Sequence, residues 1–456
     1  MTTSAPDRAA LLSTLFSDRL AAAWSTSVAV IDARRLTGGA SRETWALTVR
    51  REDAGELRVI ARIDTVAKGS LALEVEAISA AAKVGVPVPE VYDSGTDDQV
   101  VGGAFMLVAF VDGETIPRKL LRDEEYAGAR DGLARTMGRT LARIHTADLP
   151  DSELLTTVAD PLGDMIRDNG LGVPVAPGLA LGLRELRRRA PSSGRTTLVH
   201  GDFRLGNLLI DGDGLAAVLD WELVHRGDPV EDLGWLCAKV WRFGSPLPAG
   251  GVGTREELLD GYAEEAGWRP TDEHLAWWEL FATVKWGMMC QRMTTTHTSG
   301  AQPSVERAAI GRRTCEQEFD VLLALGLDEP HQAPPLPDYS EGTDLYGWPN
   351  AAQLADGVSH FLTTSAMPLG GALGFEARVA ANVVAMLQRE ALLGPEARRT
   401  HAAQLTSLGV ADDAELSLAI ERGDLDARWA EVTTAVRAAV RDRVAVANPR
   451  HLERPV

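Results

Sequence analysis

The sequence predicts an α+β fold in which a sheet comes first and helices follow, and three observations lead to this prediction. Apolar runs rich in β-favouring residues recur within residues 1–111. Helical periodicity prevails afterwards, beginning with the amphipathic stretch 127–146. A polar segment at 328–349 contains several prolines and reads as a linker. Behind it, residues 350–456 are rich in Ala, Leu and Arg with helical periodicity, so we expect an all-α C-terminal domain there.

The individual elements follow from local pattern. An amphipathic helix is expected at 8–24, ahead of the first strand. The expected strands lie at 28–31, 44–49, 57–63 and 104–111. A helix at 71–84 ends where prolines follow at 87 and 89, because a proline disfavours helix at the residue before it. Three further helices are expected over 254–325.

Composition and charge narrow the class of protein. The 456 residues are enough for two or three domains, and a formal net charge of −19 argues against a nucleic-acid surface. The short basic run Arg187–Arg189 reads as the solvated end of a helix. Three cysteines show no metal or redox spacing, which fits a reducing cytoplasm. No signal peptide or membrane-spanning run is recognised, so we expect a cytoplasmic protein without a membrane or nucleic-acid partner.

One stretch carries the chemistry. Residues 200–210 read His-Gly-Asp-Phe-Arg-Leu-Gly-Asn-Leu-Leu-Ile, and an Asp-Trp-Glu triplet follows at 220–222. Two apolar strands therefore flank a loop that presents Asp202 and Asn207, and a turn leads to a second strand ending in Asp220. Phosphoryl transfer needs a carboxylate near the acceptor hydroxyl and oxygen ligands for Mg²⁺. We assign the first role to Asp202 and the second to Asn207 and Asp220.

These residues also carry a family resemblance. The segment from His200 to Trp235 resembles the aminoglycoside phosphotransferase-like kinase family, most of all the kinase-like domains fused to certain acyl-CoA dehydrogenases. The resemblance covers about residues 20 to 325. It implies a bilobal protein-kinase-like fold with a nucleotide-binding N-lobe at 1–111 and a catalytic, acceptor-binding C-lobe at 112–327. ATP or GTP, together with Mg²⁺, would be the cofactors.

The nucleotide would be held by residues of the first lobe. Gly38, Gly39 and Ser41 lie where the family has its nucleotide-covering loop, and adjacent glycines let backbone amides approach phosphate oxygens. Arg62 stands where protein kinases place a lysine, and we interpret it as the phosphate-binding cation. Glu74 is its expected partner, with Glu76 as the alternative.

The resemblance also places the remaining parts of the site. Backbone groups from Ala109 to Val111 would bind the adenine edge. Asp228 and Asp232 are expected to cap a helix and brace the catalytic loop, and His145 is expected to be structural. Glu222 and His225 lie close to the motif without an assigned role.

The acceptor is the open question. Between residues 275 and 300 only Glu279 is acidic, whereas a polycationic aminoglycoside would need several carboxylates. An apolar wall with Lys285 and Arg292 suits an acidic or acyl-bearing hydroxyl compound better. The leading hypothesis is an ATP- and Mg²⁺-dependent O-phosphotransferase acting on a small metabolite, with a hydroxyacyl-CoA or a hydroxy acid as candidates.

Two alternatives stay open at this point. One is an aminoglycoside or macrolide phosphotransferase, and the other is a nucleotide-binding pseudokinase scaffold. Residues 350–456 resemble an uncharacterised helical module found beside such kinases, which suggests docking onto the kinase, a protein partner or a second copy.

Overall fold

The computed structural model describes residues 5–36, 42–64, 70–97, 99–148, 153–170, 174–191, 194–340 and 347–454. Two compact units emerge. The first comprises Met1–Ala159, Ser193–Cys237 and Trp241–Leu275. The second comprises Asp160–Ser192, Ala238–Val240 and Ala276–Val456. Each unit is built from segments that are far apart in the sequence.

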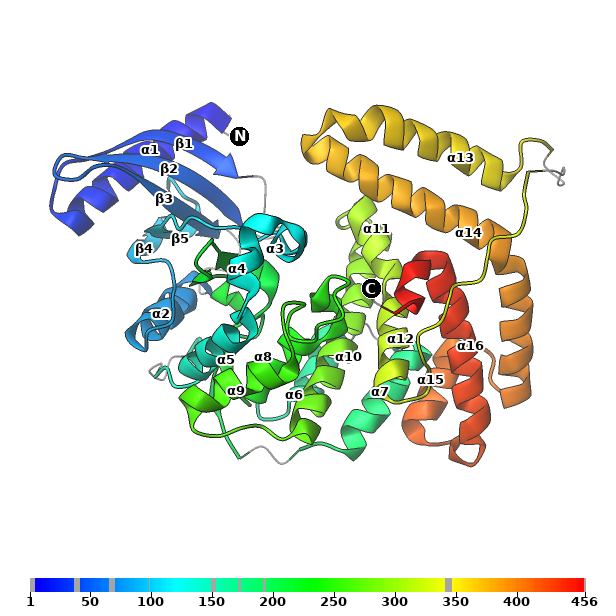
Figure 1. The fold of residues 1–456 in the computed structure, drawn as a ribbon. Helices are drawn as coiled ribbons and strands as arrows, with labels where there is room; N and C mark the ends of the chain where they lie inside the picture. The colour runs from blue at the N-terminus through cyan, green and yellow to red at the C-terminus, as the bar shows by residue number, and fades with distance from the viewer. Residues whose placement is uncertain are drawn as a thin grey trace. The chain divides into compact units, whose positions relative to one another are not determined.

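The first unit begins with the predicted sheet, which is antiparallel (Figure 1). Its strands are β1 (Val28–Leu36), β2 (Glu43–Arg51), β3 (Gly55–Asp64), β4 (Val91–Asp97) and β5 (Gly103–Ala109). They pair in the order β1-β2-β3-β5-β4, and every neighbouring pair is antiparallel. Helix α1 (Ala5–Trp24) covers one face, where its Leu12, Phe16 and Leu20 join a core with alternate residues of the central strands.

The rest of this unit frames the catalytic loop. Its helices are α2 (Ser70–Lys83), α3 (Pro117–Arg122), α4 (Ala127–Arg130), α5 (Leu133–Ile144), α8 (Val230–Cys237) and α9 (Arg255–Ala266). Two short antiparallel pairs join β6 (Thr197–Val199) to β9 (His225–Gly227) and β7 (Leu208–Ile210) to β8 (Leu215–Val218). The single helix predicted over 127–146 is divided, because Gly132 adopts a left-handed conformation with φ +72° between α4 and α5.

Helices α5 and α9 cross at unusually close range. A Cβ atom on Gly138 would lie 2.0 Å from the carbonyl oxygen of Leu258, and one on Gly261 would lie 2.1 Å from that of Arg135. Only glycine allows the two backbones to meet there. This contact fixes α5, which ends immediately before His145, against α9, which carries Tyr262.

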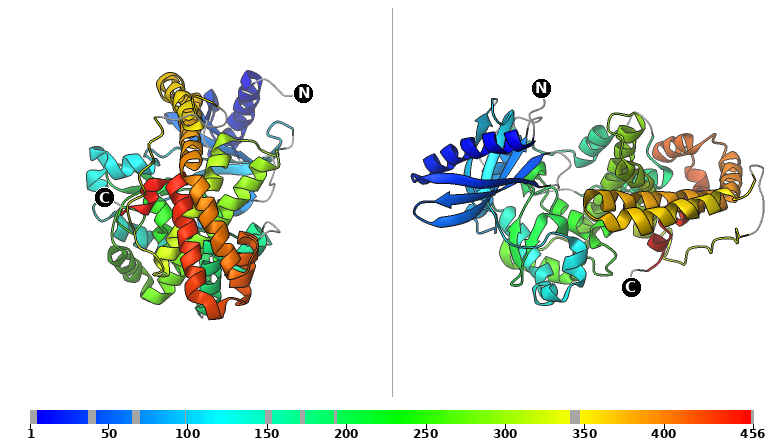
Figure 2. Two further views of the ribbon diagram at one scale, coloured as in Figure 1. Left: turned by 90° about the vertical axis from the view of Figure 1, so that its right-hand side faces the viewer. Right: turned by 90° about the horizontal axis from the view of Figure 1, so that it is seen from above.

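The second unit is all-helical in the part that the structure describes. Its helices are α6 (Pro161–Asn169), α7 (Pro177–Arg188), α11 (Val305–Arg312), α12 (Thr314–Ala324), α13 (Ala351–Phe361), α14 (Gly371–Leu408), α15 (Asp413–Arg422) and α16 (Trp429–Ala447). Most of α10 (Asp272–Thr298) belongs to it as well. Helices α13 and α14 run side by side, as Figure 1 shows, and Figure 2 gives two further views of the ribbon.

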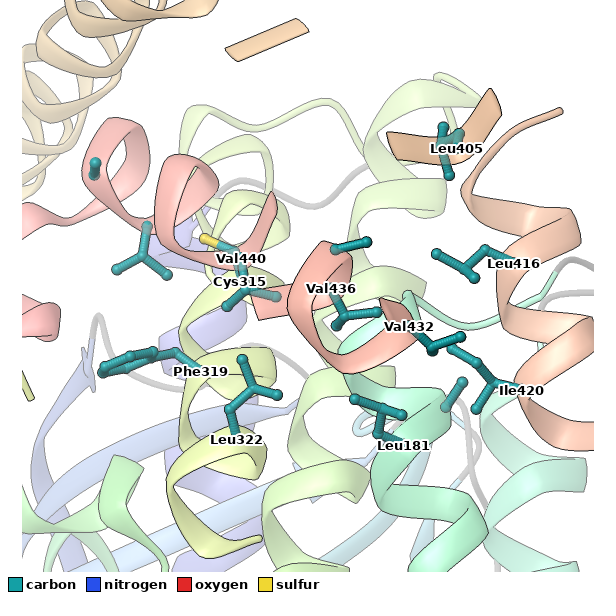
Figure 3. Close-up of a cluster of buried hydrophobic side chains, with 14 of the residues drawn as sticks. Leu181, Cys315, Phe319, Leu322, Leu405, Leu416, Ile420, Val432, Val436 and Val440 are labelled. Atoms are coloured by element: carbon teal, nitrogen blue, oxygen red, sulfur yellow. The ribbon is translucent and has the colours of Figure 1, made fainter. Parts of the chain in front are cut away.

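The C-terminal helices share one core with helices that the sequence assigned to the C-lobe. Leu181 of α7 and Phe319 of α12 pack in the same cluster as Ile420 of α15 and Val436 of α16 (Figure 3). The predicted boundary at 328–349 therefore marks a change in composition but does not separate two cores. The physical reason is that the apolar faces of α7 and α12 are covered by residues from 405 to 452.

Charged groups reinforce this joint core. Arg443 of α16 pairs with Glu318 of α12 at 3.1 Å and with Asp413. His451 contacts Asp320, also on α12, with 2.8 Å between Nε2 and Oδ1. Among the described helices, none is both long and apolar enough to cross a membrane.

Candidate active site

The catalytic loop begins at a glycine that no other residue can replace without strain. Gly201 has φ +82°, and a Cβ atom there would lie 2.6 Å from the carbonyl oxygen of Leu223. The loop therefore turns sharply after β6 and packs against the segment that follows β8. This turn directs the next residue, Asp202, into the site.

A buried carboxylate holds the turn in place. Asp232, on α8, accepts hydrogen bonds from the backbone N–H groups of His200 (2.8 Å) and Gly201 (2.9 Å). His145 donates to it from Nε2 at 3.1 Å, and Nδ1 of the same ring lies 2.9 Å from the Tyr262 hydroxyl oxygen. Burial alone would raise the pKa of Asp232, but the hydrogen bond and charge of His145 hold it below its usual value.

The neighbouring Asp228 caps the same helix. Its Oδ1 accepts from the backbone N–H of Val230 at 2.9 Å, at the first residue of α8, and its Oδ2 contacts Nε2 of His274 at 2.8 Å. Asp228 thus caps α8 and Asp232 braces the catalytic loop, as the sequence analysis predicts.

Three donors converge on the carboxylate of Asp202. Nδ2 of Asn207 donates to Oδ2 at 2.6 Å, and Nε1 of Trp235 donates to Oδ1 at 2.8 Å. Nε of Arg204 donates to Oδ1 at 3.0 Å, and its guanidinium lies over the ring of Trp241, 4.8 Å from the centroid. The side chain of Asp202 is 14% exposed. The three donors therefore fix its orientation, while part of the carboxylate stays accessible to solvent.

Arg204 and Trp235 were not assigned a role from the sequence. The available signal for Arg204 was its place two residues after Asp202 within the motif. No sequence signal pointed to Trp235, because α8 brings it to the loop from 33 residues away.

Leu219 joins Asp220 to the catalytic loop through its backbone. Its N–H donates to the carbonyl of Asn207 at 2.9 Å, and its carbonyl accepts from Nε2 of His200 at 3.0 Å. Burial lowers the pKa of His200, which keeps the ring neutral and lets Nδ1 accept from the N–H of Asp202 at 3.2 Å. Asp220 follows with φ +66°, a conformation that aspartate tolerates better than most side chains.

Arg62 lies between two carboxylates, those of Glu74 and Asp220. The sequence analysis predicts only Glu74 as its partner. Its Nη1 is 3.1 Å from Oε2 of Glu74, and its Nη2 is 2.9 Å from Oδ1 of Asp220. Glu74 is fully buried on α2, whereas Glu76 is exposed, so Glu74 is the partner. Burial raises the pKa of Glu74, although Arg62 and Arg42 act in the opposite direction.

A second arginine, which sequence reasoning left without a role, belongs to the same cluster. Arg42 immediately precedes β2, and its side chain is only 7% exposed. It pairs with Asp64 at 3.2 Å, with Glu74, and with Glu222 at 3.4 Å. Burial and the nearby charge of Asp220 raise the pKa of Glu222 above its usual value.

The other predicted residues fall in three groups. Gly38, Gly39 and Ser41 lie outside the described residues. At the end of β5, the N–H of Ala109 donates to the carbonyl of Glu90 at 2.8 Å. Within the described residues, no backbone carbonyl accepts from the N–H of Val111. His225 lies on β9, and its Nε2 is 3.2 Å from Oε2 of Glu231 on α8.

The aromatic helix predicted near the acceptor is largely internal. Trp277, Trp278 and Phe281 of α10 are 7%, 2% and 3% exposed, so they belong to the core and do not form an exposed apolar wall. The guanidinium of Arg292 donates to the carbonyl of Asp168 at 2.8 Å, within the second unit.

The donor set can accommodate a divalent cation. Nδ2 of Asn207 is committed to Asp202, which leaves its Oδ1 as the atom available to a cation. The carboxylate of Asp220 is 33% exposed, and the surrounding carboxylates outnumber the arginines. No described cluster contains three His, Cys, Asp or Glu residues with metal-binding geometry. A cation here would therefore need oxygens from the nucleotide and water as well.

Comparison with known proteins agrees with the fold. The Ralstonia eutropha protein solved as a candidate aminoglycoside phosphotransferase superposes with a TM-score of 0.51 at 21% identity, over 65% of this chain and 92% of that chain. This likeness confirms the predicted kinase-like fold of the aminoglycoside phosphotransferases.

Sequence relatives extend the comparison. Acyl-CoA dehydrogenase family member 10 of Mus musculus is 27% identical over 330 residues, which is 66% of this chain and 30% of the relative. The probable acyl-CoA dehydrogenase IBR3 of Arabidopsis thaliana is 29% identical over 170 residues, which is 33% of this chain and 20% of the relative. The chain thus spans less than a third of the length of these curated relatives.

Two family descriptions match the chain. Residues 368–451 match a domain of unknown function (DUF6285), in agreement with the predicted uncharacterised helical module. Residues 32–274, more than half of the chain, match the description "Phosphotransferase enzyme family" and include the whole Asp202 and Asp220 site. The chain therefore belongs to the phosphotransferase enzyme family.

Proposed function

We propose that this protein is an ATP- and Mg²⁺-dependent kinase that phosphorylates a hydroxyl group of a small metabolite. One observation carries the proposal. The backbone of Leu219 attaches Asp220 to the loop that presents Asp202 and Asn207, and Arg62 contacts Asp220 from the sheet. A candidate base, candidate cation ligands and a candidate phosphate-binding arginine thus lie within one unit of the fold.

The residues divide the reaction between them. Asp202 accepts the proton of the acceptor hydroxyl, whose oxygen forms a bond to the γ-phosphorus while the bond from that phosphorus to the β,γ-bridging oxygen breaks. Arg62 and Arg204 offset negative charge on the phosphate oxygens. Asn207 and Asp220 would hold Mg²⁺, which supplies further charge neutralisation when bound. The carbonyl of Ala109 and the N–H of Val111 are the backbone groups proposed for the adenine edge.

For the acceptor we favour a hydroxyacyl thioester or a hydroxy acid. The relatives named above are acyl-CoA dehydrogenases by name, which favours acyl-bearing compounds over antibiotics. The scarcity of acidic residues from 275 to 300 also disfavours a polycationic aminoglycoside. A panel of hydroxyacyl-CoAs, hydroxy acids and aminoglycosides, assayed for ADP release with ATP and GDP release with GTP, would identify both substrates.

The test of the catalytic assignment is Asp202→Ala. We expect turnover to fall by about 10²–10⁴-fold, the usual contribution of a positioned base, with little change in MgATP binding measured by calorimetry. Asp211→Asn is the matched control, because Asp211 caps the exposed β7–β8 turn through the N–H groups of Asp213 and Gly214. Equal turnover in Asp202→Ala and the control would refute the role of Asp202. Failure of the wild-type protein to bind either nucleotide would refute the kinase proposal and favour a scaffolding role.

The predicted contact of the C-terminal helices with a protein partner or a second copy stays a proposal. Its support is a set of large apolar side chains on α13 and α14 that are about half exposed or more. They are Leu354, Val358, Phe361, Leu373 and Leu387. Light scattering coupled to size-exclusion chromatography, over a concentration series, would detect a second copy.

A further inference from the structure

Arg42 connects three segments that surround the nucleotide site. It is the residue immediately before β2, and it follows the predicted nucleotide-covering loop in the sequence. Its guanidinium pairs with Asp64 at the end of β3, with Glu74 on α2, and with Glu222 on the loop after β8. With 7% of its side chain exposed, Arg42 is too enclosed to be an ordinary surface arginine.

Glu74 is shared between two arginines. Its Oε1 binds Arg42, and its Oε2 binds Nη1 of Arg62 at 3.1 Å. Because Oε1 is taken, Arg62 contacts Glu74 through a single nitrogen, and its Nη2 extends to Asp220 at 2.9 Å. Without Arg42, both oxygens of Glu74 would be open to Arg62, and a two-pronged arginine–carboxylate pair is the stronger arrangement. Arg62 would then be drawn toward α2 and away from Asp220.

The second connection reaches the proposed metal loop directly. Glu222 lies two residues after Asp220, and its Oε2 is 3.4 Å from Nη2 of Arg42. This pair ties the loop after β8 to the sheet at the point where β2 begins. The proposed cation ligand and the proposed phosphate-binding arginine are therefore both linked to one buried guanidinium.

We propose that Arg42 is a positioning residue for the nucleotide, which keeps Arg62 extended between Glu74 and Asp220 and holds the Asp220 loop against the sheet. This role rests on the nucleotide-binding function proposed above. In this role the effect of Arg42 on nucleotide binding passes through Arg62. A purely structural role would instead make Arg42 a brace of the sheet, with no dependence on Arg62.

A double-mutant cycle separates these two roles, because residues that act through one another are not additive. The variants are Arg42→Met, Arg62→Met and the double variant, with Kd for MgATP measured by calorimetry and unfolding midpoints measured in parallel. Arg8→Met is the control. Arg8 pairs with Glu43, the residue next to Arg42, through Nε at 3.0 Å, and braces the same sheet without touching Glu74 or Asp220.

We expect Arg42→Met to weaken MgATP binding by about tenfold in the wild-type background, the loss of one charge-assisted contact. In the Arg62→Met background the same change should alter Kd by less than about twofold. Arg8→Met should lower the unfolding midpoint without changing Kd. An equal effect of Arg42→Met in both backgrounds, or no effect in either, would overturn the proposal.

Arg42→Lys covers the case in which Arg42→Met does not fold. A lysine keeps the charge but lacks the planar fork that reaches three carboxylates. It should weaken binding by about threefold, again only when Arg62 is present. A wild-type Kd in Arg42→Lys would overturn the proposal. A wild-type protein that binds no nucleotide would refute the proposed function itself, which distinguishes the two failures.

Discussion

Replacing Asp232 by asparagine tests how the catalytic loop is held. The wild-type carboxylate is fully buried and accepts from three donors, namely Nε2 of His145 and the N–H groups of His200 and Gly201. An asparagine can place its oxygen toward His145 and His200, but its NH₂ group then faces the backbone N–H of Gly201, and neither of these two donors has an acceptor. Two buried donors without an acceptor, at about 1–3 kcal/mol each, predict a loss of about 2–6 kcal/mol.

The loss can be measured as the change in the urea midpoint of the unfolding transition that reports on the first unit. Asp213→Asn, in the exposed β7–β8 turn, is the control and should change stability by less than about 0.5 kcal/mol. Turnover should fall as well, because one of the two backbone anchors of the turn before Asp202 is lost. An Asp232→Asn protein that matches the control in stability and turnover would refute this account of the loop.

The same residue makes a pH prediction. The folded-state pKa of Asp232 lies below its usual value, so its stabilising contribution is present above about pH 4, the unfolded pKa. The contribution declines as the pH falls below that value toward the folded pKa. The stability difference between wild type and Asp232→Asn should therefore shrink on acidification below about pH 4, and a difference that grows there would contradict the assignment.

Three further predictions concern other parts of the molecule. Gly138→Ala places a methyl group 2.0 Å from a backbone oxygen of α9, so it should lower the unfolding midpoint of the first unit by an amount equivalent to about 1–3 kcal/mol or more; an unchanged midpoint would contradict the close crossing. Arg443→Met leaves the buried carboxylate of Glu318 without its arginine and should cost the second unit about 3–5 kcal/mol in chemical denaturation, with Arg443→Lys less affected. Trp235→Phe removes one donor to Asp202 and should lower kcat by about tenfold with unchanged MgATP binding; an unchanged kcat would show that the indole N–H does not orient the base.

The parts of the site that lie close together in sequence were predictable. Asp202, Asn207 and Asp220 occupy one loop and the strand after it, and their chemistry and spacing indicate phosphoryl transfer without knowledge of the fold. Glu74 was distinguished from Glu76 by its spacing, and burial agrees, since only Glu74 is enclosed. Alternating apolar residues likewise indicate that β2 and β3 are strands, whereas the antiparallel sheet is implied by the family resemblance.

The missed residues have a common reason. Arg42, Arg204 and Trp235 acquire their positions through contacts between side chains, and such contacts depend on how separate elements pack. A buried arginine surrounded by three carboxylates has the same local sequence signal as an exposed one. Pattern and propensity describe single elements, so they could not rank Arg42 above other arginines of the sheet.

The domain boundary predicted at 328–349 does not separate two cores, for a similar reason. Prolines and polar residues at 328–349 indicate a connection, but they do not say which apolar faces meet afterwards. The acidic residues of α12 would normally suggest a solvated face, whereas Glu316, Glu318 and Asp320 are 3%, 2% and 5% exposed. Their partners, Arg443 and His451, lie more than 100 residues further along the chain.

The shared core also has a consequence for biosynthesis. A chain emerging from the ribosome completes α7 by residue 188 and α12 by residue 324, yet the side chains that cover them arrive between residues 405 and 452. During that interval Leu181, Phe319 and Leu322 have no native partners from α15 and α16, and exposed apolar surface of this kind favours chaperone binding or aggregation. The first unit is complete by Leu275, so its site can form on the ribosome well before the second unit closes.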